Sequence, residues 1–109
     1  MGRPKGAVAL PVTAATQWCD GKIAHTFADR SGGVYIFGTW RNDWQQICNL
    51  NFVWKEISVS SCRAWFSTSQ TAVVTQQPVI VSIDTTSCAT MPTYGESPSP
   101  IYLMLRSAL

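Results

Sequence analysis

Hydrophobic and polar positions alternate along the first half of the chain, and this pattern predicts β-strands. Residues 21–27 alternate strictly, and residues 33–40 are β-branched and aromatic, as strands prefer. Gly and short polar residues separate the two segments and are typical of a turn. Residues 41–43 (Arg-Asn-Asp) can form a three-residue hairpin loop leading into a third strand at 44–53. The pattern therefore predicts a three-stranded meander.

The predicted hairpin also assigns side chains to faces. If Trp40 and Trp44 face each other across the loop, the same register sets Ile36 opposite Cys48, and His25 becomes a buried core histidine. The opposite face carries Tyr35, Phe37 and Ile47. An apolar face of this kind is typically covered by another part of the protein or by a partner. We therefore predict that the protein forms a homo-oligomer through Tyr35, Phe37 and Ile47.

A change of hydrophobic period predicts one helix between residues 58 and 74. Its apolar stripe recurs at helical spacing, with Ser60 or Ser61 as candidate N-cap and Pro78 as the breaker that follows. The stripe consists of Cys62, Trp65, Phe66, Ser69, Ala72 and Val73. Two further strands, 79–84 and 101–106, flank a long Pro-rich loop at 85–100. Loops of this length are usually functional or tied by a disulfide.

Composition and charge narrow the class of protein. The chain has 109 residues, the size of one domain, and Arg3 and Lys5 account for its net charge of +2. A neutral body without a basic cluster argues against nucleic-acid binding, and no apolar run is long enough for a membrane span. Residues 1–16 read as either a signal-peptide remnant or a flexible arm. Residues 17–109 form the single predicted domain.

Four cysteines and a single histidine bear on metal and compartment. No Cys-x-x-Cys spacing is present, so we expect no metal and no cofactor. An even cysteine count with low charge favours disulfides and a secreted or periplasmic protein, although four buried thiols are the alternative. The spacing leaves all three connectivities open.

Three strands, one helix and two more strands give the order β-β-β-α-β-β of an OB-like five-stranded barrel. In this order and in size, residues 17–106 resemble the binding subunits of pentameric bacterial toxins. The resemblance implies a secreted protein with a carbohydrate-binding surface and a disulfide from the N-terminal segment to a late part of the barrel, here Cys19 with Cys88. The other pair, Cys48 with Cys62, would tie the third strand to the helix start. The Pro-rich loop and the second cysteine pair depart from the family pattern.

Aromatic side chains carry the main functional hypothesis, recognition of a glycan or cell-surface receptor. Trp40 and Trp44 flank Asn42 and Asp43, and a sugar ring can stack on an indole while amide and carboxylate groups bind its hydroxyls. A plain cross-strand Trp pair is the structural alternative. The candidate ligand-binding residues are Trp40, Asn42, Asp43, Trp44, Tyr94 and Tyr102.

Two other functions compete with glycan binding. An interaction or inhibitor protein would present the Pro-rich loop 85–100 to a partner. A small hydrolase, ranked third, would have to use His25, the only imidazole. No Gly-x-Ser-x-Gly elbow is present, and the carboxylates fall at turns and strand ends. The sequence therefore gives no support to an enzyme.

Overall fold

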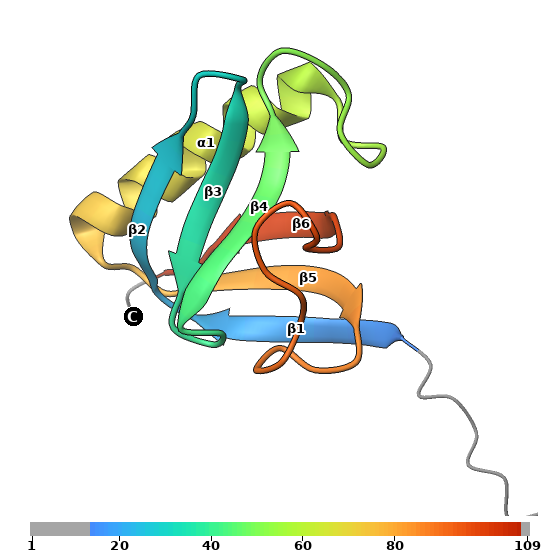
Figure 1. Cartoon of the computed structure of the whole chain (residues 1–109). Coiled ribbons are helices and arrows are strands. Elements are labelled where there is room, and N and C mark those ends of the chain that lie inside the picture. The colour runs from blue at the N-terminus through green and yellow to red at the C-terminus, as the bar shows by residue number, and fades with distance from the viewer. Residues whose placement is uncertain (1–13, 108–109) are drawn as a thin grey trace, which may run out of the picture.

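The computed structural model describes residues 14–107, which form two three-stranded antiparallel sheets and one helix (Figure 1). One sheet has the strand order β1-β5-β6 and the other the order β2-β3-β4. The elements are β1 (Ala15–Gly21), β2 (Ile23–Ala28), β3 (Gly33–Gly38), β4 (Asp43–Asn49), α1 (Val59–Thr75), β5 (Val79–Thr85) and β6 (Pro100–Leu105). The prediction of a mainly β fold with one helix is confirmed.

The predicted number of strands is wrong, because the described chain has six strands rather than five and they do not close into a barrel. The additional strand is β1, whose first two residues fall within the predicted arm. In β1 the exposed Trp18 stands among polar residues, and Cys19 is the buried apolar side chain. Local alternation is therefore weak, and the strand exists because it pairs along its whole length with β5.

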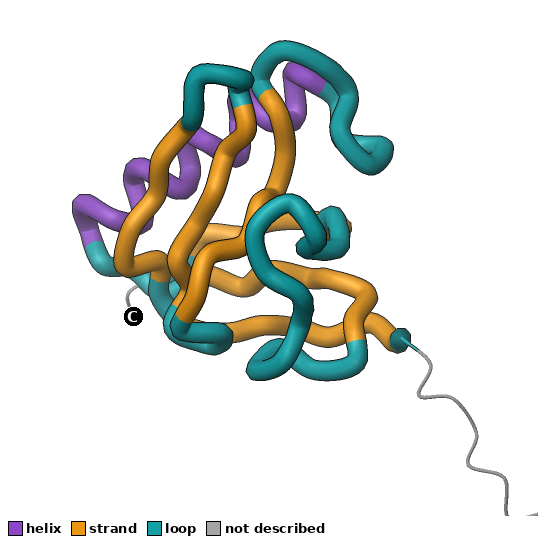
Figure 2. Tube along the Cα trace, viewed as in Figure 1, coloured by secondary structure: helices purple, strands orange, loops and turns teal. Residues whose placement is uncertain are grey.

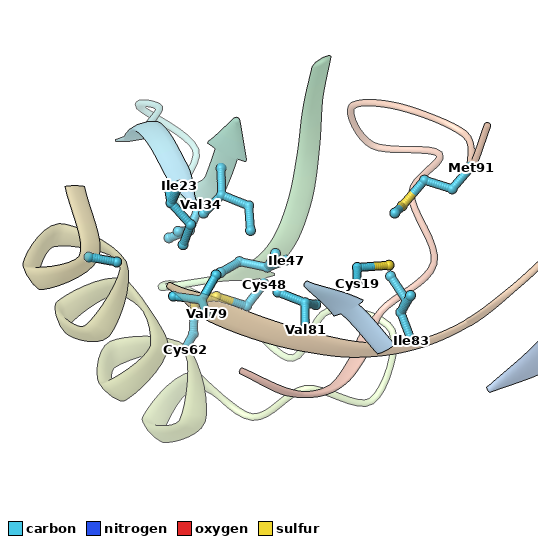
Figure 3. Packing of buried hydrophobic residues seen from close by; sticks show 12 residues of the cluster. Cys19, Ile23, Val34, Ile47, Cys48, Cys62, Val79, Val81, Ile83 and Met91 are labelled. Atoms are coloured by element: carbon cyan, nitrogen blue, oxygen red, sulfur yellow. A yellow bond between two sulfur atoms is a disulfide. The ribbon is translucent and has the colours of Figure 1, made fainter. Parts of the chain in front are cut away.

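The core lies between α1, the inner face of β2-β3-β4 and the inner face of β1-β5-β6. Figure 1 shows α1 running behind the β2-β3-β4 sheet, with the other three strands crossing below. Side chains from both sheets, from α1 and from the 86–99 loop meet there (Figure 3). The buried apolar residues are Cys19, Ile23, Val34, Ile36, Ile47, Cys48, Cys62, Ala72, Val79, Val81, Ile83 and Met91.

Helix α1 follows the predicted stripe and differs at its cap. Ser58, rather than Ser60 or Ser61, is the N-cap, and its Oγ accepts a hydrogen bond from the backbone N–H of Ser61 at 3.1 Å. At the other end Gln76 adopts φ 57° and donates its N–H to the Ala72 carbonyl, a left-handed helix end. The stripe residues are all buried or packed against the core.

The register predicted between residues 33–40 and 44–53, which correspond to β3 and β4, is wrong. Ile36 pairs with Gln45 rather than Cys48, and Gly38 pairs with Asp43 across a four-residue turn. The indole of Trp40 lies over Gly38, where any Cβ would collide with the ring, so Trp40 turns inward and does not face Trp44. An irregularity in β4 also turns Ile47 into the core, where it is 1% exposed. Ile47 therefore cannot belong to a self-association surface.

A second irregularity overturns the prediction for His25. The pairing of β2 with β3 shifts between Ile23 and His25, so Ile23 enters the core while His25 and Phe27 emerge on the opposite face. A one-residue shift exchanges the two faces of a strand. His25 is consequently exposed rather than a buried core histidine.

Both predicted disulfides are present. Cys19–Cys88 ties β1 to the start of the 86–99 loop, and Cys48–Cys62 ties β4 to the first turns of α1. Within the part of the chain that the structure describes, no helix has the length and apolar character needed to cross a membrane.

Candidate functional site

Five rings gather on the outer face of the β2-β3-β4 sheet, the face turned away from α1. We call this set, His25, Phe27, Tyr35, Phe37 and Trp44, the aromatic face. The strand register produces it, because Phe27 pairs with Tyr35, His25 pairs with Phe37, and Phe37 pairs with Trp44. Residues paired across antiparallel strands project from the same face. The five rings therefore form one continuous surface across three strands.

Trp44 is the centre of the aromatic face. Its ring lies edge-on to Phe27 at 4.8 Å and to Phe37 at 5.3 Å, measured between ring centroids, and His25 is at 6.2 Å. Phe27 and Tyr35 are stacked at 4.8 Å. These are favourable offset and edge-to-face geometries. The rings hold one another in place while remaining partly accessible, and Phe27 is 38% exposed.

A sixth ring joins from the long loop. The loop runs beside β4 (Figure 2), and the N–H of Tyr94 donates to the Trp44 carbonyl at 2.9 Å while the Tyr94 carbonyl accepts from the N–H of Gln46. The Tyr94 ring is 6.3 Å from that of Tyr35 and is 51% exposed. Tyr94 thus extends the aromatic face beyond the edge of the sheet.

Polar groups stand at the end of the aromatic face nearest the β2-β3 turn. Asp29 Oδ1 accepts hydrogen bonds from the N–H and hydroxyl of Ser31 and from the N–H of Gly33. The Tyr35 ring, Asp29 Oδ2 and the Gln46 amide all lie around Gly33, so the charge of Asp29 acts on the Tyr35 hydroxyl. The Gln46 amide donates to the Cys48 carbonyl. We call the Asp29 carboxylate, the Tyr35 hydroxyl and the Gln46 amide the polar corner.

Gly33 makes the polar corner possible. A Cβ at this position would lie 3.1 Å from the Tyr35 ring and 3.2 Å from both Asp29 Oδ2 and the Gln46 amide nitrogen. Such contacts are tight, so a side chain here would push the three groups apart. The absence of a side chain lets them converge.

The polar corner should be visible in a pH titration. Burial, followed by the negative charge of Asp29, raises the pKa of Tyr35 above the ordinary tyrosine value. We expect Asp29→Asn to lower the pKa of Tyr35 only in part, because burial remains. The absorbance of the phenolate measures this, with Tyr35→Phe to assign the transition. A Tyr35 transition that does not move in Asp29→Asn contradicts the contact.

The hydrogen bonds to the Asp29 carboxylate determine whether the stability of the protein rises or falls at acid pH. Hydrogen bonds from Ser31 and Gly33 lower the pKa of Asp29 below its ordinary value. The stability that this carboxylate contributes is therefore present above the ordinary aspartate pKa and is lost as the pH falls through the lower folded value.

The structure separates the ligand-binding residues predicted from the sequence. Trp44 and Tyr94 come together at the aromatic face. Asn42 is an exposed turn residue, and Asp43 accepts a hydrogen bond from the N–H of Trp44. Trp40 packs toward the core and donates its indole N–H to Gln45 Oε1 at 2.9 Å. Tyr102 pairs with Ser82 in the other sheet and does not join the rest.

Sequence reasoning missed most of the candidate site. His25 and Phe27 were assigned to the core side. Asp29 was interpreted as a solvated turn carboxylate, and neither Asp29 nor Gln46 was named as a ligand-binding residue. The alternation of Tyr35 and Phe37 opposite two ring-bearing residues of the preceding segment was the available signal. The irregularity between Ile23 and His25 hid it, because it reverses the faces of β2.

The described residues contain no candidate metal site. Among residues 14–107, no three His, Cys, Asp or Glu side chains converge in a way that could hold a metal ion. The rings nearest His25 are Phe37 and Trp44.

No protein family, no curated protein and no solved structure matches this chain.

Proposed function

We propose that this protein binds a carbohydrate on the aromatic face, as a secreted or periplasmic recognition domain. The observation that carries the proposal is the continuous surface of partly exposed rings that ends at the polar corner. A ligand bound there would meet apolar ring faces and hydrogen-bonding groups within one site.

The chemistry of a sugar suits this combination. One side of a pyranose ring presents C–H groups that pack on an aromatic ring, and its edge carries hydroxyls that need polar partners. At the border of the aromatic face, the exposed Asp29 carboxylate supplies an acceptor. The Gln46 side chain beside it is 6% exposed and already donates to the Cys48 carbonyl, so it offers a ligand only its remaining polar atoms. A hydrogen bond from a sugar hydroxyl to the charged carboxylate is stronger than one between two neutral groups. Trp44 and Phe27 would take the apolar side.

The two disulfides support the proposed location, because such bonds persist outside the reducing cytosol. Self-association through Tyr35 and Phe37 is a competing use of the same surface. It predicts a concentration-dependent mass in light scattering that Phe37→Ala abolishes, whereas sugar binding needs no second copy.

Presentation of the 85–100 loop to a partner protein is the alternative function. Met91 and Ser97 of this loop are buried, the Ser97 hydroxyl donates to the Tyr94 carbonyl, and Arg41 Nε donates to the Met91 carbonyl at 2.8 Å. Because the loop is held against the rest of the protein by these contacts, a partner could contact only its exposed residues. We therefore favour the sugar-binding function.

A glycan array comparing the parent with Trp44→Ala tests the proposal. We expect binding to weaken by roughly tenfold or more, a loss of about 1.4 kcal/mol that is typical of a central aromatic contact. Trp18→Ala is the matched control, because Trp18 is 62% exposed on the other sheet, and it should bind like the parent. A parent that binds no glycan, or equal losses in both variants, would refute the proposal.

A further inference from the structure

Tyr94 depends on groups outside its own segment for its position. Residues 93–95 lie beside β4 through one bridge, with the Tyr94 N–H on the Trp44 carbonyl and the Tyr94 carbonyl on the N–H of Gln46 at 3.3 Å. Tyr94 itself has φ 55°, in the left-handed region that side chains rarely adopt. The Tyr94 carbonyl also accepts from the N–H of Ser97 at 3.1 Å and from the Ser97 hydroxyl at 2.6 Å. Tyr94 and Ser97 therefore belong to one turn, and a group that holds Ser97 also helps to hold Tyr94.

Lys55 holds the chain immediately after Tyr94. Its ammonium donates to the carbonyls of Gly95 at 2.9 Å and of Ser97 at 2.7 Å, which lie 40 and 42 residues further along the chain. The same ammonium lies 4.7 Å from the centroid of the Trp54 ring, a cation–π arrangement. These charge-assisted hydrogen bonds join the β4-α1 connection to the long loop.

The backbone around Lys55 is bent to make this contact. Trp54 and Ile57 exchange two hydrogen bonds, and Lys55 and Glu56 between them have φ values of 43° and 73°. Two consecutive positive φ angles define a type I′ turn, which normally carries Asn or Gly. Lysine and glutamate are unfavourable at these two positions. The turn nevertheless places the Lys55 ammonium against the carbonyls of the loop.

We propose that Lys55 is a positioning residue for the ligand site: by holding the Gly95 and Ser97 carbonyls, it fixes Tyr94 against Tyr35 and completes the aromatic face. The role of Lys55 in ligand binding rests on the proposed sugar-binding function. The contact itself can be tested without any ligand.

Amide hydrogen exchange, followed by NMR on the full chain, tests the contact. In Lys55→Met, which keeps the alkyl stem and removes the donors, we expect the Tyr94 amide to exchange roughly tenfold faster or more. The Leu50 amide, bonded to the Gly32 carbonyl at 2.8 Å, should keep its rate. Lys22→Met is the matched control and should leave both amides unchanged. Unaltered Tyr94 exchange, or equal acceleration at Leu50, overturns the inference.

The glycan array provides the second readout. If Lys55 acts through Tyr94, Lys55→Met weakens binding in the parent and has no further effect in a Tyr94→Ala background. Equal losses in both backgrounds show that Lys55 acts independently, which overturns the positioning role. A parent that binds no glycan defeats the proposed function instead, and the exchange measurement then decides on the contact alone.

Discussion

Removal of the Cys19–Cys88 disulfide, by changing both residues to alanine, is expected to lower the free energy of unfolding by roughly 4 kcal/mol. The two cysteines are 69 residues apart in sequence, and closing a loop of this length restricts the unfolded chain strongly. Such a loss is large against the total stability of a small domain, about 5 to 15 kcal/mol. Urea denaturation without reductant measures it.

The second disulfide provides the matched comparison. Cys48–Cys62 closes a loop with a sequence separation of only 14, so the corresponding double alanine variant should lose roughly 3 kcal/mol. Removal of Cys19–Cys88 should also accelerate amide exchange in the 86–99 loop, because Cys88 holds its first residues to β1. A larger loss for the shorter loop would contradict the expectation that loop closure dominates.

Trp40→Ala is expected to destabilise the protein by roughly 3 kcal/mol, in the range for loss of a large packed aromatic side chain. The ring packs against the core and over Gly38, and its N–H donates to Gln45 Oε1. Gln45 is fully buried, and its amide nitrogen has no hydrogen-bond partner among residues 14–107. Without Trp40 the whole amide of Gln45 loses its partner, a further cost.

Thermal unfolding of Trp40→Ala and Trp18→Ala side by side checks this expectation. Trp18 is exposed on the outer face of β1-β5-β6, so its removal should change the stability by at most about 0.5 kcal/mol. If Trp40→Ala is as stable as Trp18→Ala, the indole of Trp40 is free of the core. Trp40 would then become available as the ligand contact that the sequence suggested.

The helix shows what a local pattern can predict. Its apolar stripe is spaced so that one face alone can be buried, and this spacing is a property of neighbouring residues. The stripe was therefore predicted correctly, and so was the end before Pro78. The N-cap was missed by two or three residues, because Ser58, Ser60 and Ser61 all have the chemistry to cap and only the path of the chain selects Ser58.

The candidate site depended on information that is not local. Trp44 and Tyr94 were recognisable as candidates, yet nothing near them in sequence indicated that Phe27, Tyr35 and Asp29 would join them. Lys55 lies in a segment without any motif, and its partners follow about 40 residues later. Pairing between distant segments decides such contacts, and no short window of sequence contains it.

The sequence by itself determined the β-rich class, the single helix and the turn between β2 and β3, because alternation, helical spacing and Gly-rich polar segments act over a few residues. Only the tertiary structure decided that β1 joins β5, that the sheets stay separate and that one irregularity in β2 turns His25 and Phe27 outward. A strand has two faces that differ by one residue of register. The choice between them is made by the core that the whole chain can bury, and here that choice placed five rings on the surface.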